Sequence, residues 1–457
     1  MIVKTLSEKE ISYRYSLVIL FKITLFKAGK KFVGAPTFVF LSPMKGFYNI
    51  SIFFLGLGLR IWSLFNAKAR EFVTGRKGIF KKMEDAVRQN TQPIIWVHCA
   101  SLGEFEQGRP VIEALKAAFE NHKIFLTFFS PSGYLVRKGY SKADYVFYLP
   151  LDTSRNARRF VEILKPRLAI FIKYEFWYYY SKTLKKNKVP LLSISSIFRK
   201  EQFFFRKTGS FNRRILKNIT HFFVQNQESV ELLRSINIYN ASVSGDTRFD
   251  RVKQIADQRQ EIEIARKFKG DDRVFVIGSA WQEDLDVLVP FINENKLKFI
   301  VAPHEINENL LLHLQDAITV RSVLYSEAEG KNLEDFDVLI INNVGFLSRL
   351  YRYGEFAYIG GAFGKGLHNI LEAASNGIPV LFGNKNYEKF QEAMDLINRG
   401  GAFPVADYSD LRHKYEMLNI PESFLLACEV CRQYVEANTG ATQKIMEYCR
   451  GVLKHEG

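Results

Sequence analysis

Glycine, histidine, asparagine and glutamate side chains gather in "IGGAFGKGLHNILEAASNGIPVLFG", residues 359–383. The stretch opens with four glycines, which permit close approach of the backbone to a ligand. These are Gly360, Gly361, Gly364 and Gly366. Asn369 stands near the start of a predicted helix, "NILEAASNG", whose free N–H groups and dipole favour a phosphate. Glu372 lies one turn further, where it could bind the hydroxyls of a ribose. The stretch therefore favours a nucleotide phosphate, although an ordinary strand–loop–helix connection has the same pattern.

Carboxylates follow two predicted strands of the first half of the chain. Glu104 ends the turn "SLGE" after the apolar run "PIIWVHCAS" (93–101). A carboxylate there either caps the following helix or acts as a general base, and both interpretations stay open. Glu175 comes directly after "LAIFIKY" between aromatic residues, and it is either a functional group of a cleft or a solvated loop residue.

Other polar groups also stand just past predicted strands. Ser279 follows "RVFVIG", and His304 follows "LKFIVAP". Ligands of open α/β sheets bind at the carboxyl ends of the strands. A single residue of this kind is weak support for a site, but several at the same edges of two sheets are stronger.

The elements that must position these residues alternate regularly from residue 90 onward. Near-continuous apolar strands are separated by helical segments, which indicates parallel sheets covered on both faces. The pattern runs twice, with a polar helical linker over 245–268. The fold class predicted is α/β, with two Rossmann-like domains facing across a cleft and a membrane-associated helix before them. The predicted divisions are an N-terminal extension (1–43), the membrane-associated helix (44–70), a first Rossmann-like domain (71–250), a second Rossmann-like domain (251–435) and a C-terminal helix (436–457) that packs back on the first domain.

Composition narrows the class of partner. The 457 residues carry a net charge of +16, which favours a polyanion: nucleic acid, an anionic membrane face or a phosphorylated substrate. We find no nucleic-acid-binding module. Four cysteines are too few for a disulfide framework, and Cys428 and Cys431 fall on one face of a predicted helix as small hydrophobic residues. These features indicate a reducing compartment.

The segment "MKGFYNISIFFLGLGLRIWSLFNAKAR" (44–70) is apolar but short for a membrane span, because Arg60 interrupts it. An interfacial or partly inserted helix fits better, with a buried core helix as the alternative. Basic residues that follow would face anionic head groups. These are Lys68, Arg70, Arg76, Lys77, Lys81 and Lys82.

A set of motifs in this order resembles the Kdo transferases, the 3-deoxy-D-manno-octulosonic acid transferases of lipopolysaccharide synthesis. The motifs are "WVHCASLGEFEQGRPVIEAL", "IKYEFW", "VQNQESVELLRSINIYNASVSGDTRFDRV", "GSAWQED", "VAPHE" and "IGGAFGKGLHNILEAASNGIPVLFGNKNYEKFQEA". The resemblance runs from about Met44 to near the C-terminus.

The resemblance implies the two-domain glycosyltransferase fold called GT-B, a CMP-Kdo donor and a lipid A precursor as acceptor. It implies an inverting transfer that needs no metal or other cofactor, at the cytoplasmic face of the bacterial inner membrane, and no nucleic-acid partner. Glu104 would then be the catalytic base. The donor site would contain Gly361, Ala362, His368, Asn369, Glu372, Ser279 and His304. The acceptor site or cleft would contain Ser101, Gly103, Glu175 and Arg199.

The chain departs from the family pattern at three places. Leu367 stands where a second glycine is frequent, Pro303 and His304 lack an arginine between them, and an Asn-Ala-Arg run is replaced by Ser195 and Ser196, with Arg199 shifted in register. These changes affect individual donor contacts more than the reaction class. Two alternatives remain: another nucleotide-sugar enzyme of this fold, such as a UDP-sugar transferase or epimerase, and a non-catalytic basic protein.

Overall fold

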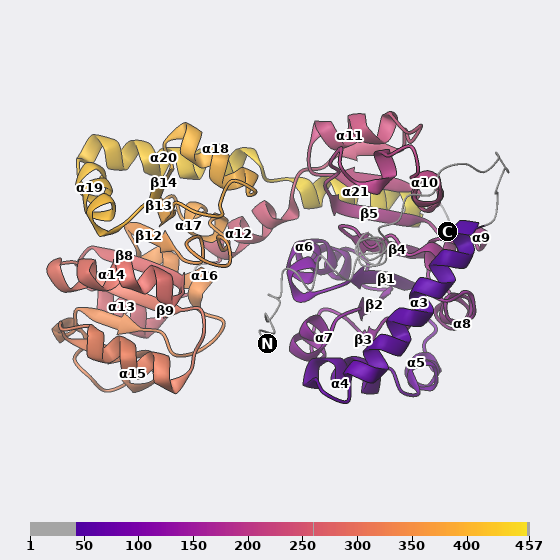
Figure 1. Cartoon of the computed structure of the whole chain (residues 1–457), viewed down its shortest axis with the longest axis horizontal. Helices are drawn as coiled ribbons and strands as arrows, with labels where there is room; N and C mark the ends of the chain where they lie inside the picture. The colour runs from indigo at the N-terminus through magenta and orange to yellow at the C-terminus, as the bar shows by residue number, and fades with distance from the viewer. Residues whose placement is uncertain (1–42, 259, 455–457) are drawn as a thin grey trace, which may run out of the picture. The chain divides into compact units, whose positions relative to one another are not determined.

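The computed structural model describes residues 43–258 and 260–454. The chain divides into two compact units (Figure 1). Unit 1 comprises Met1–Thr247 with Gly440–Gly457, and unit 2 comprises Arg248–Thr439. The predicted N-terminal extension lies, up to residue 42, outside the described residues.

Unit 1 is built on a seven-stranded sheet in which every pairing is parallel, with the order β3-β2-β1-β4-β5-β6-β7. The strands are β1 (Ile94–Cys99), β2 (Lys123–Phe128), β3 (Tyr145–Tyr148), β4 (Leu168–Ile172), β5 (Leu191–Ser196), β6 (His221–Val224) and β7 (Ala241–Val243). β1 and β4 are buried along their whole length, since helices cover both faces of the sheet.

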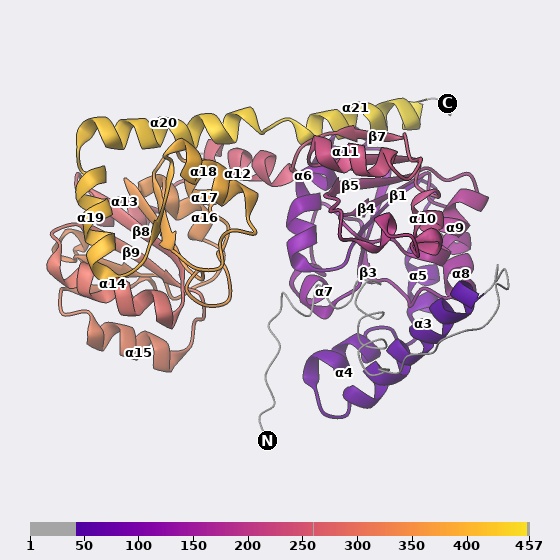
Figure 2. The same cartoon turned by 45° about the horizontal axis from the view of Figure 1, so that its top comes forward.

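The helices of unit 1 form two layers. They are α3 (Pro43–Trp62), α4 (Ala67–Thr74), α5 (Ile79–Val87), α6 (Leu102–Ala118), α7 (Pro131–Arg137), α8 (Ser154–Leu164), α9 (Tyr178–Lys186), α10 (Ser210–Leu216), α11 (Gln227–Arg234) and α21 (Ala441–Lys454), with the 3-10 turn η1 (Phe203–Phe205). The C-terminal α21 lies beside α6 (Figure 2). Its Ile445, Met446 and Cys449 are buried in the same apolar cluster as the residues of β1.

Unit 2 repeats the plan with a second parallel sheet, ordered β10-β11-β9-β8-β12-β13-β14. Its strands are β8 (Val274–Ala280), β9 (Lys298–Pro303), β10 (Ser322–Leu324), β11 (Val338–Ile340), β12 (Phe356–Ile359), β13 (Val380–Gly383) and β14 (Ala402–Val405). Its helices are α12 (Thr247–Asp257), α13 (Glu263–Lys269), α14 (Gln282–Glu294), α15 (Glu308–Ala317), α16 (Leu347–Leu350), α17 (Leu371–Ala374), α18 (Gln391–Arg399), α19 (Tyr408–Leu418) and α20 (Pro421–Ala437), and its 3-10 turns are η2 (Tyr325–Glu327), η3 (Leu333–Asp335) and η4 (Tyr351–Tyr353).

The parallel-sheet architecture confirms the predicted α/β fold class, and it also locates the functional edge of each sheet. The strand order reverses between β1 and β4 in unit 1 and between β8 and β12 in unit 2. Open α/β sheets bind ligands outside the carboxyl ends of the strands at such a switch point. The loops to examine are therefore those after these four strands.

Several elements differ from the sequence-based expectation. The "SLGE" turn is already the first turn of α6, which runs on through Pro110. The helix expected to begin near Asn369 is a single turn, α17, because Gly377 follows it in a left-handed conformation with φ of 68°. The short edge strands β7, β10 and β14 were not predicted, since they lack a long apolar run.

The apolar segment 44–70 forms two helices, α3 and α4, with Asn66 as the N-cap residue of the second. One side of α3 packs on unit 1 through Tyr48, Ile52 and Leu59, which are 3 to 5% exposed. Tyr48 also donates a hydrogen bond to the buried Asp152. Among the described helices, α3 included, none is both long and apolar enough to cross a membrane.

Arg76 does not face outward, contrary to the expectation that it would contact head groups. Its guanidinium lies 3.6 Å from the centroid of the Phe72 ring and donates to the carbonyls of Phe72, Phe129 and Leu149. Desolvation lowers the pKa of Arg76 to about 9. Arg76 joins α4 to the ends of β2 and β3, so its positive charge has a structural role.

Candidate active site

Glu104 lies at the switch point of unit 1. β1 ends at Cys99, Ser101 is the N-cap residue of α6, and Glu104 is the third residue of that helix. Its side chain is 8% exposed and turns back, so that Oε2 accepts a hydrogen bond of 2.5 Å from the backbone N–H of Ala100. One carboxylate oxygen therefore caps the turn. This contact does not exclude base chemistry, because a carboxylate has two oxygens and several lone pairs.

The surroundings of Glu104 favour proton transfer near neutral pH. Burial, and secondly the carboxylate of Glu175, raise the pKa of Glu104 from 4.5 to about 8, although Lys173 and the Ala100 N–H oppose this. A general base works best when its pKa lies near the operating pH. A carboxylate tuned in this way at a switch point has the properties of a catalytic group.

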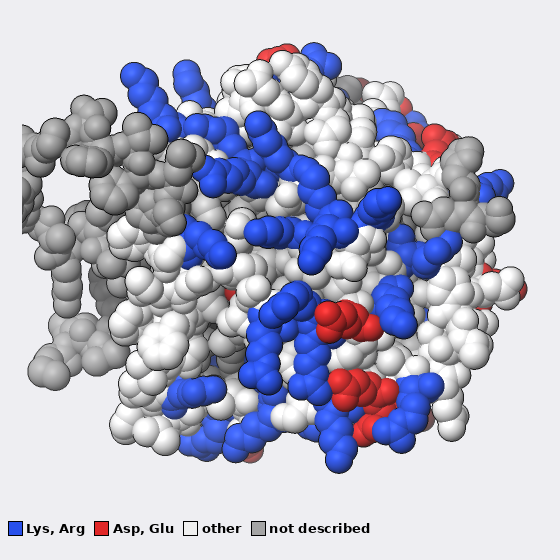
Figure 3. Space-filling model, turned by 90° about the vertical axis from the view of Figure 1, so that its right-hand side faces the viewer, with Lys and Arg blue, Asp and Glu red and all other residues white. Residues whose placement is uncertain are grey.

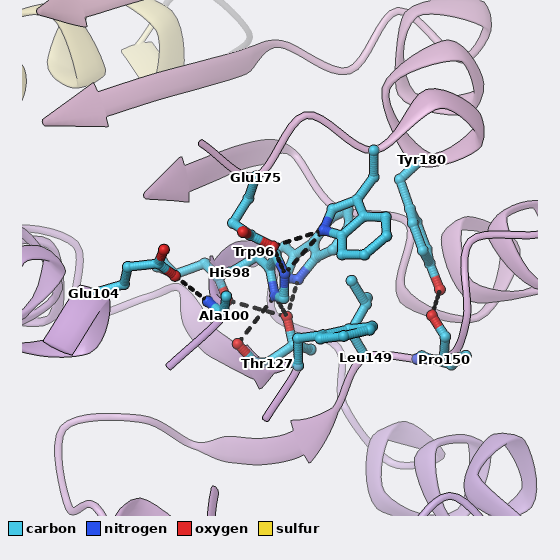
Figure 4. A network of polar contacts seen from close by, with 12 residues as sticks. Trp96, His98, Ala100, Glu104, Thr127, Leu149, Pro150, Glu175 and Tyr180 are labelled. Atoms are coloured by element: carbon cyan, nitrogen blue, oxygen red, sulfur yellow. Dashed lines mark hydrogen bonds and ion pairs between the residues drawn. The ribbon is translucent and has the colours of Figure 1, made fainter. Parts of the chain in front are cut away.

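Glu175 belongs to a buried polar network beside Glu104 (Figure 4). Its Oε2 accepts a 2.8 Å hydrogen bond from Trp177 Nε1 and lies 3.1 Å from Nε2 of His98. The other imidazole nitrogen, Nδ1, lies 2.9 Å from Thr127 Oγ1 and 3.1 Å from the Thr127 carbonyl oxygen. His98 is fully buried and Glu175 is 4% exposed.

The charge state of this network follows from burial. Desolvation lowers the pKa of His98 to about 4 and raises the pKa of Glu175 to about 7. His98 is therefore neutral near pH 7, and its contact with Glu175 is a hydrogen bond rather than an ion pair. Glu104 and Glu175 both titrate close to neutrality and influence each other, so the pair takes up and releases protons as a coupled unit.

The other predicted acceptor-side residues occupy less confined places. Ser101 makes no side-chain cap bond, and Gly103 is exposed with open space where a Cβ would stand. Arg199 is exposed on the loop after β5. The structure brings Glu104 and Glu175 near each other, whereas the interactions described join neither Ser101 nor Gly103 to either carboxylate.

Sequence reasoning missed two residues of the unit 1 site. His98 is the one strongly polar residue inside an otherwise apolar strand, and that position was the available signal. Lys173 follows β4 in a left-handed conformation with φ of 63°, which is uncommon for a residue other than glycine. Its charge lowers the pKa of Glu104, so it helps the carboxylate to ionise.

In unit 2 the loop after β12 is attached to the start of α14. Gly360 lies so close to β8 that a Cβ would stand 2.3 Å from the Ser279 carbonyl oxygen, and Gly361 has φ of 95°. The fully buried Asp284 accepts backbone N–H bonds from Trp281 (2.9 Å) and Gly361 (2.8 Å). The glycines are therefore required by close approach to the protein's own backbone, independently of any ligand.

The predicted donor residues form two groups at this edge. His304 and His368 stack with ring centroids 4.5 Å apart, and Trp281, which was not predicted, lies against both. Asn369 donates to Glu372 at 3.1 Å and accepts from the N–H of Leu371. Asn369 thus closes the single turn of α17, which is too short to provide the helix N-terminus expected from the sequence.

Ser279 and Ala362 complete the set. Ser279 has φ of 54° at the end of β8, as Ser195 has φ of 55° at the end of β5, so both are strained seryl positions at strand ends. Ala362 is fully buried, and its carbonyl accepts a 3.3 Å hydrogen bond from Asn386 Nδ2. Within residues 43–258 and 260–454, no group of three or more His, Cys, Asp or Glu side chains could hold a metal ion.

Comparison with known proteins shows what the chain as a whole is similar to. Residues 73–251 match the family described as 3-deoxy-D-manno-octulosonic-acid transferase (kdotransferase). A 3-deoxy-D-manno-octulosonic acid transferase of Aquifex aeolicus is 28% identical over 378 residues, which cover 80% of this chain and 96% of the relative. The chain is therefore similar to the Kdo transferases, with the match to the family over residues 73–251. Another member of the family, from Rickettsia typhi, is 25% identical and is covered over 80% of its length.

Solved structures agree on the fold of this chain. UDP-GlcNAc 2-epimerase from Neisseria meningitidis superposes with a TM-score of 0.57 at 16% identity, covering 78% of this chain and 99% of the epimerase. A glycosyltransferase from Rickettsia africae gives a TM-score of 0.51 at 13% identity, covering 80% of this chain and 99% of the other. At these identities the likeness shows the GT-B fold alone.

Proposed function

We propose that this protein transfers Kdo from CMP-Kdo to a lipid A precursor, lipid IVA, with inversion at the anomeric carbon and release of CMP. The observation that carries the proposal is the buried Glu104 at the switch point of unit 1, in a chain that is similar to the Kdo transferases. The residue assignments extend the family resemblance of the motifs to the positions described above.

In the proposed reaction, an acceptor hydroxyl oxygen attacks the anomeric carbon of Kdo while the bond from that carbon to the phosphate oxygen breaks. Glu104 takes the hydroxyl proton, and CMP leaves with the bonding electrons. A single displacement with one base inverts the anomeric centre. Burial gives Glu104 a pKa of about 8, so the carboxylate is basic enough to accept this proton near neutral pH.

Unit 2 would hold the nucleotide donor at the carboxyl ends of β8, β9 and β12. The backbone of the Gly360–Gly361 loop, His304 and His368 lie there, and Glu372 stands in α17. Hydrogen-bond donors at this edge would stabilise the charge of the departing phosphate. We propose that the transfer uses no metal ion and no other cofactor, since the base and the phosphate-binding groups can be supplied by the chain.

The proposal is tested by a transfer assay with the full chain in mixed micelles. CMP-Kdo is generated in situ, tetraacylated lipid A precursor is the acceptor, and mass spectrometry detects addition of Kdo. NMR of the product establishes the anomeric configuration. EDTA is added after the donor has formed and is expected to leave the rate unchanged. Turnover of UDP-sugars with no transfer of Kdo would refute the proposal and favour a UDP-dependent enzyme.

We further propose that unit 1 binds the cytoplasmic face of the bacterial inner membrane through α3. The outward side of this helix carries large apolar residues that are 40 to 65% exposed, and we call it the α3 apolar face. It consists of Phe47, Ile50, Phe53, Phe54, Leu57, Ile61 and Trp62. Monomeric soluble proteins rarely expose a contiguous apolar surface of this kind unless it contacts a partner or a membrane.

Basic residues beside this face support an anionic membrane as the partner. α3 packs on α9 and α10 through Tyr48, whose ring contacts Tyr178, Tyr179 and Phe211. The exposed cations of α9, of α10 and of the segments next to α10 are Lys182, Lys185, Lys186, Arg206, Lys207, Arg214 and Lys217. Figure 3 shows Lys and Arg gathered over the side of the molecule that carries these helices. An apolar helix face bordered by cations fits an interfacial membrane site.

Co-sedimentation with vesicles tests this membrane site. Phe53→Ser with Phe54→Ser should abolish binding to vesicles containing anionic lipid, and added salt should weaken wild-type binding. Leu425→Ser with Leu426→Ser is the matched control, because these residues of α20 are 65 and 64% exposed. Equal loss in both double variants would contradict a specific α3 site.

A further inference from the structure

Trp281 and His368 form a flat hydrogen-bonded pair at the edge of the unit 2 sheet. Their rings are nearly coplanar, with an interplanar angle of 9°, and Trp281 Nε1 lies 2.9 Å from His368 Nε2. The indole N–H can only donate, so His368 Nε2 must accept. A neutral imidazole that accepts at Nε2 carries its proton on Nδ1.

Two further side chains hold the indole ring in place. The His304 ring stacks on Trp281 with centroids 4.1 Å apart and an angle of 23°, and it also stacks on His368. The ammonium of Lys365 lies 3.7 Å from the Trp281 ring centroid. Two groups this close cannot share one face, so His304 and Lys365 cover opposite faces of the indole. The contacts are a ring stack and a cation–π interaction.

The backbone beneath the pair is equally constrained. The backbone N–H groups of Trp281 and Gly361 both donate to Oδ2 of Asp284. The backbone N–H of His304 donates to the Ala280 carbonyl at 2.8 Å. The strand ends of β8, β9 and β12 are thus joined around Trp281. The indole cannot turn away from His368 without breaking the stack or moving these ends.

We propose that Trp281 is a positioning residue that fixes His368 as the neutral Nδ1–H tautomer, so that the imidazole donates to an anionic oxygen of the nucleotide donor. The claim that His368 donates to the nucleotide donor rests on the proposed function, because it takes the donor to be a nucleoside monophosphate ester of an acidic sugar. The claim that Trp281 fixes the tautomer of His368 rests only on the geometry within unit 2. Lys365 adds a cation next to the same edge, which suits an anionic ligand.

The tautomer is measured directly by NMR of the full chain labelled with ¹⁵N-histidine. Correlations from the ring carbons to the two nitrogens distinguish Nδ1–H from Nε2–H, and a His368→Asn spectrum assigns the signal. At pH 7.5 the wild type is expected to show His368 as Nδ1–H. Detection of Nε2–H or of the imidazolium in the wild type would overturn the proposal without any Trp281 variant.

Trp281→Phe keeps a ring for His304 and Lys365 but removes the N–H. In this variant the Nδ1–H form should lose its dominance, and CMP affinity measured by calorimetry should fall. If the competent tautomer drops to about a fifth of the population, the apparent affinity falls about fivefold. Tyr325→Phe, which removes the hydroxyl of another half-buried ring of unit 2, is the control and should change neither quantity.

The outcomes separate this inference from the proposed function. An unchanged tautomer in Trp281→Phe, or a changed tautomer with CMP affinity within twofold of wild type, would overturn it. If the wild type binds no CMP, the proposed donor is wrong, and the tautomer measurement still decides whether Trp281 sets the state of His368.

Discussion

Replacing Glu104 by glutamine separates its proposed catalytic role from its structural one. The amide oxygen of glutamine can still accept the N–H of Ala100, so the cap of α6 is retained. The amide cannot take a proton from the acceptor hydroxyl. We therefore expect transfer to fall by about 10²- to 10⁴-fold, the usual contribution of general-base catalysis.

The same substitution should stabilise unit 1, although it lowers the rate of transfer. The unfolded carboxyl ionises above pH 4.5, whereas the folded one stays protonated up to about pH 8. Stability contributed by this group therefore falls as the pH rises through that window. At 1.36 kcal/mol per pH unit, the cost reaches up to about 3 kcal/mol at pH 7. Glu104→Gln, neutral at every pH, should be more stable than the wild type by up to this amount.

Two assays measure these effects. Initial rates of Kdo transfer between pH 6 and pH 9 should rise in the wild type towards a plateau above about pH 8, where Glu104 is ionised. Hydrogen exchange of peptides from β1 and β4 reports the unfolding free energy of unit 1 separately from unit 2. The stability difference between variant and wild type should be near zero at pH 4.5 and largest above pH 8.

Glu106→Gln is the matched control on the same helix. Glu106 is partly exposed and pairs with Arg137 at 2.7 Å, so its loss should cost less than about 1 kcal/mol and leave transfer within twofold. The reasoning would be refuted if Glu104→Gln lost less than tenfold in rate. It would also be refuted if the variant destabilised unit 1 at pH 7, because Glu104 would then be mainly a charged structural group.

Three further predictions concern the site. Glu175→Gln should abolish the change of the transfer rate with pH that occurs near pH 7, because burial raises the pKa of Glu175 to about 7. Gly361→Ala should lower CMP affinity and the melting temperature, since φ is 95° and the new Cβ would lie 2.8 Å from the His368 ring. Gly364→Ala is its control, because the three atoms nearest to its new Cβ belong to the flexible end of the Glu283 side chain. Asp284→Asn should lower the free energy of unfolding of unit 2 by about 1 to 3 kcal/mol, measured by urea denaturation. The carboxylate accepts hydrogen bonds from two backbone N–H groups and from the Tyr358 hydroxyl, and the amide has a single acceptor oxygen with which to replace them. An unchanged urea midpoint would contradict the importance of these three hydrogen bonds.

The repeating pattern of strands and helices could be read from sequence because it reflects burial alone. The inner strands β1, β4, β8 and β12 are apolar runs buried on both faces, so their composition identifies them. The short edge strands β7 and β10 could not be recognised in this way, since each has three residues and pairs along one side only.

The sequence placed Glu104 and Glu175 at strand ends but could not assign their charge states. Those depend on neighbours from other strands and on solvent exclusion. The buried His98, reaching Glu175 from β1, and Lys173 in its left-handed conformation became relevant only when β1 and β4 were seen side by side. Similarly, the glycines of the 360–366 stretch were interpreted as room for a ligand, whereas Gly360 is required by the backbone of β8.

The sequence by itself determined the two α/β units, the resemblance to the Kdo transferases and the strand ends that carry polar groups, because these depend on local composition, periodicity and ordered motifs. Only the tertiary structure decided that Arg76 is an internal cation, that α17 is a single turn and that Trp281 binds His368. The physical reason is that hydrogen-bond partners and desolvation are set by residues distant in the chain, and no local pattern records which of them meet.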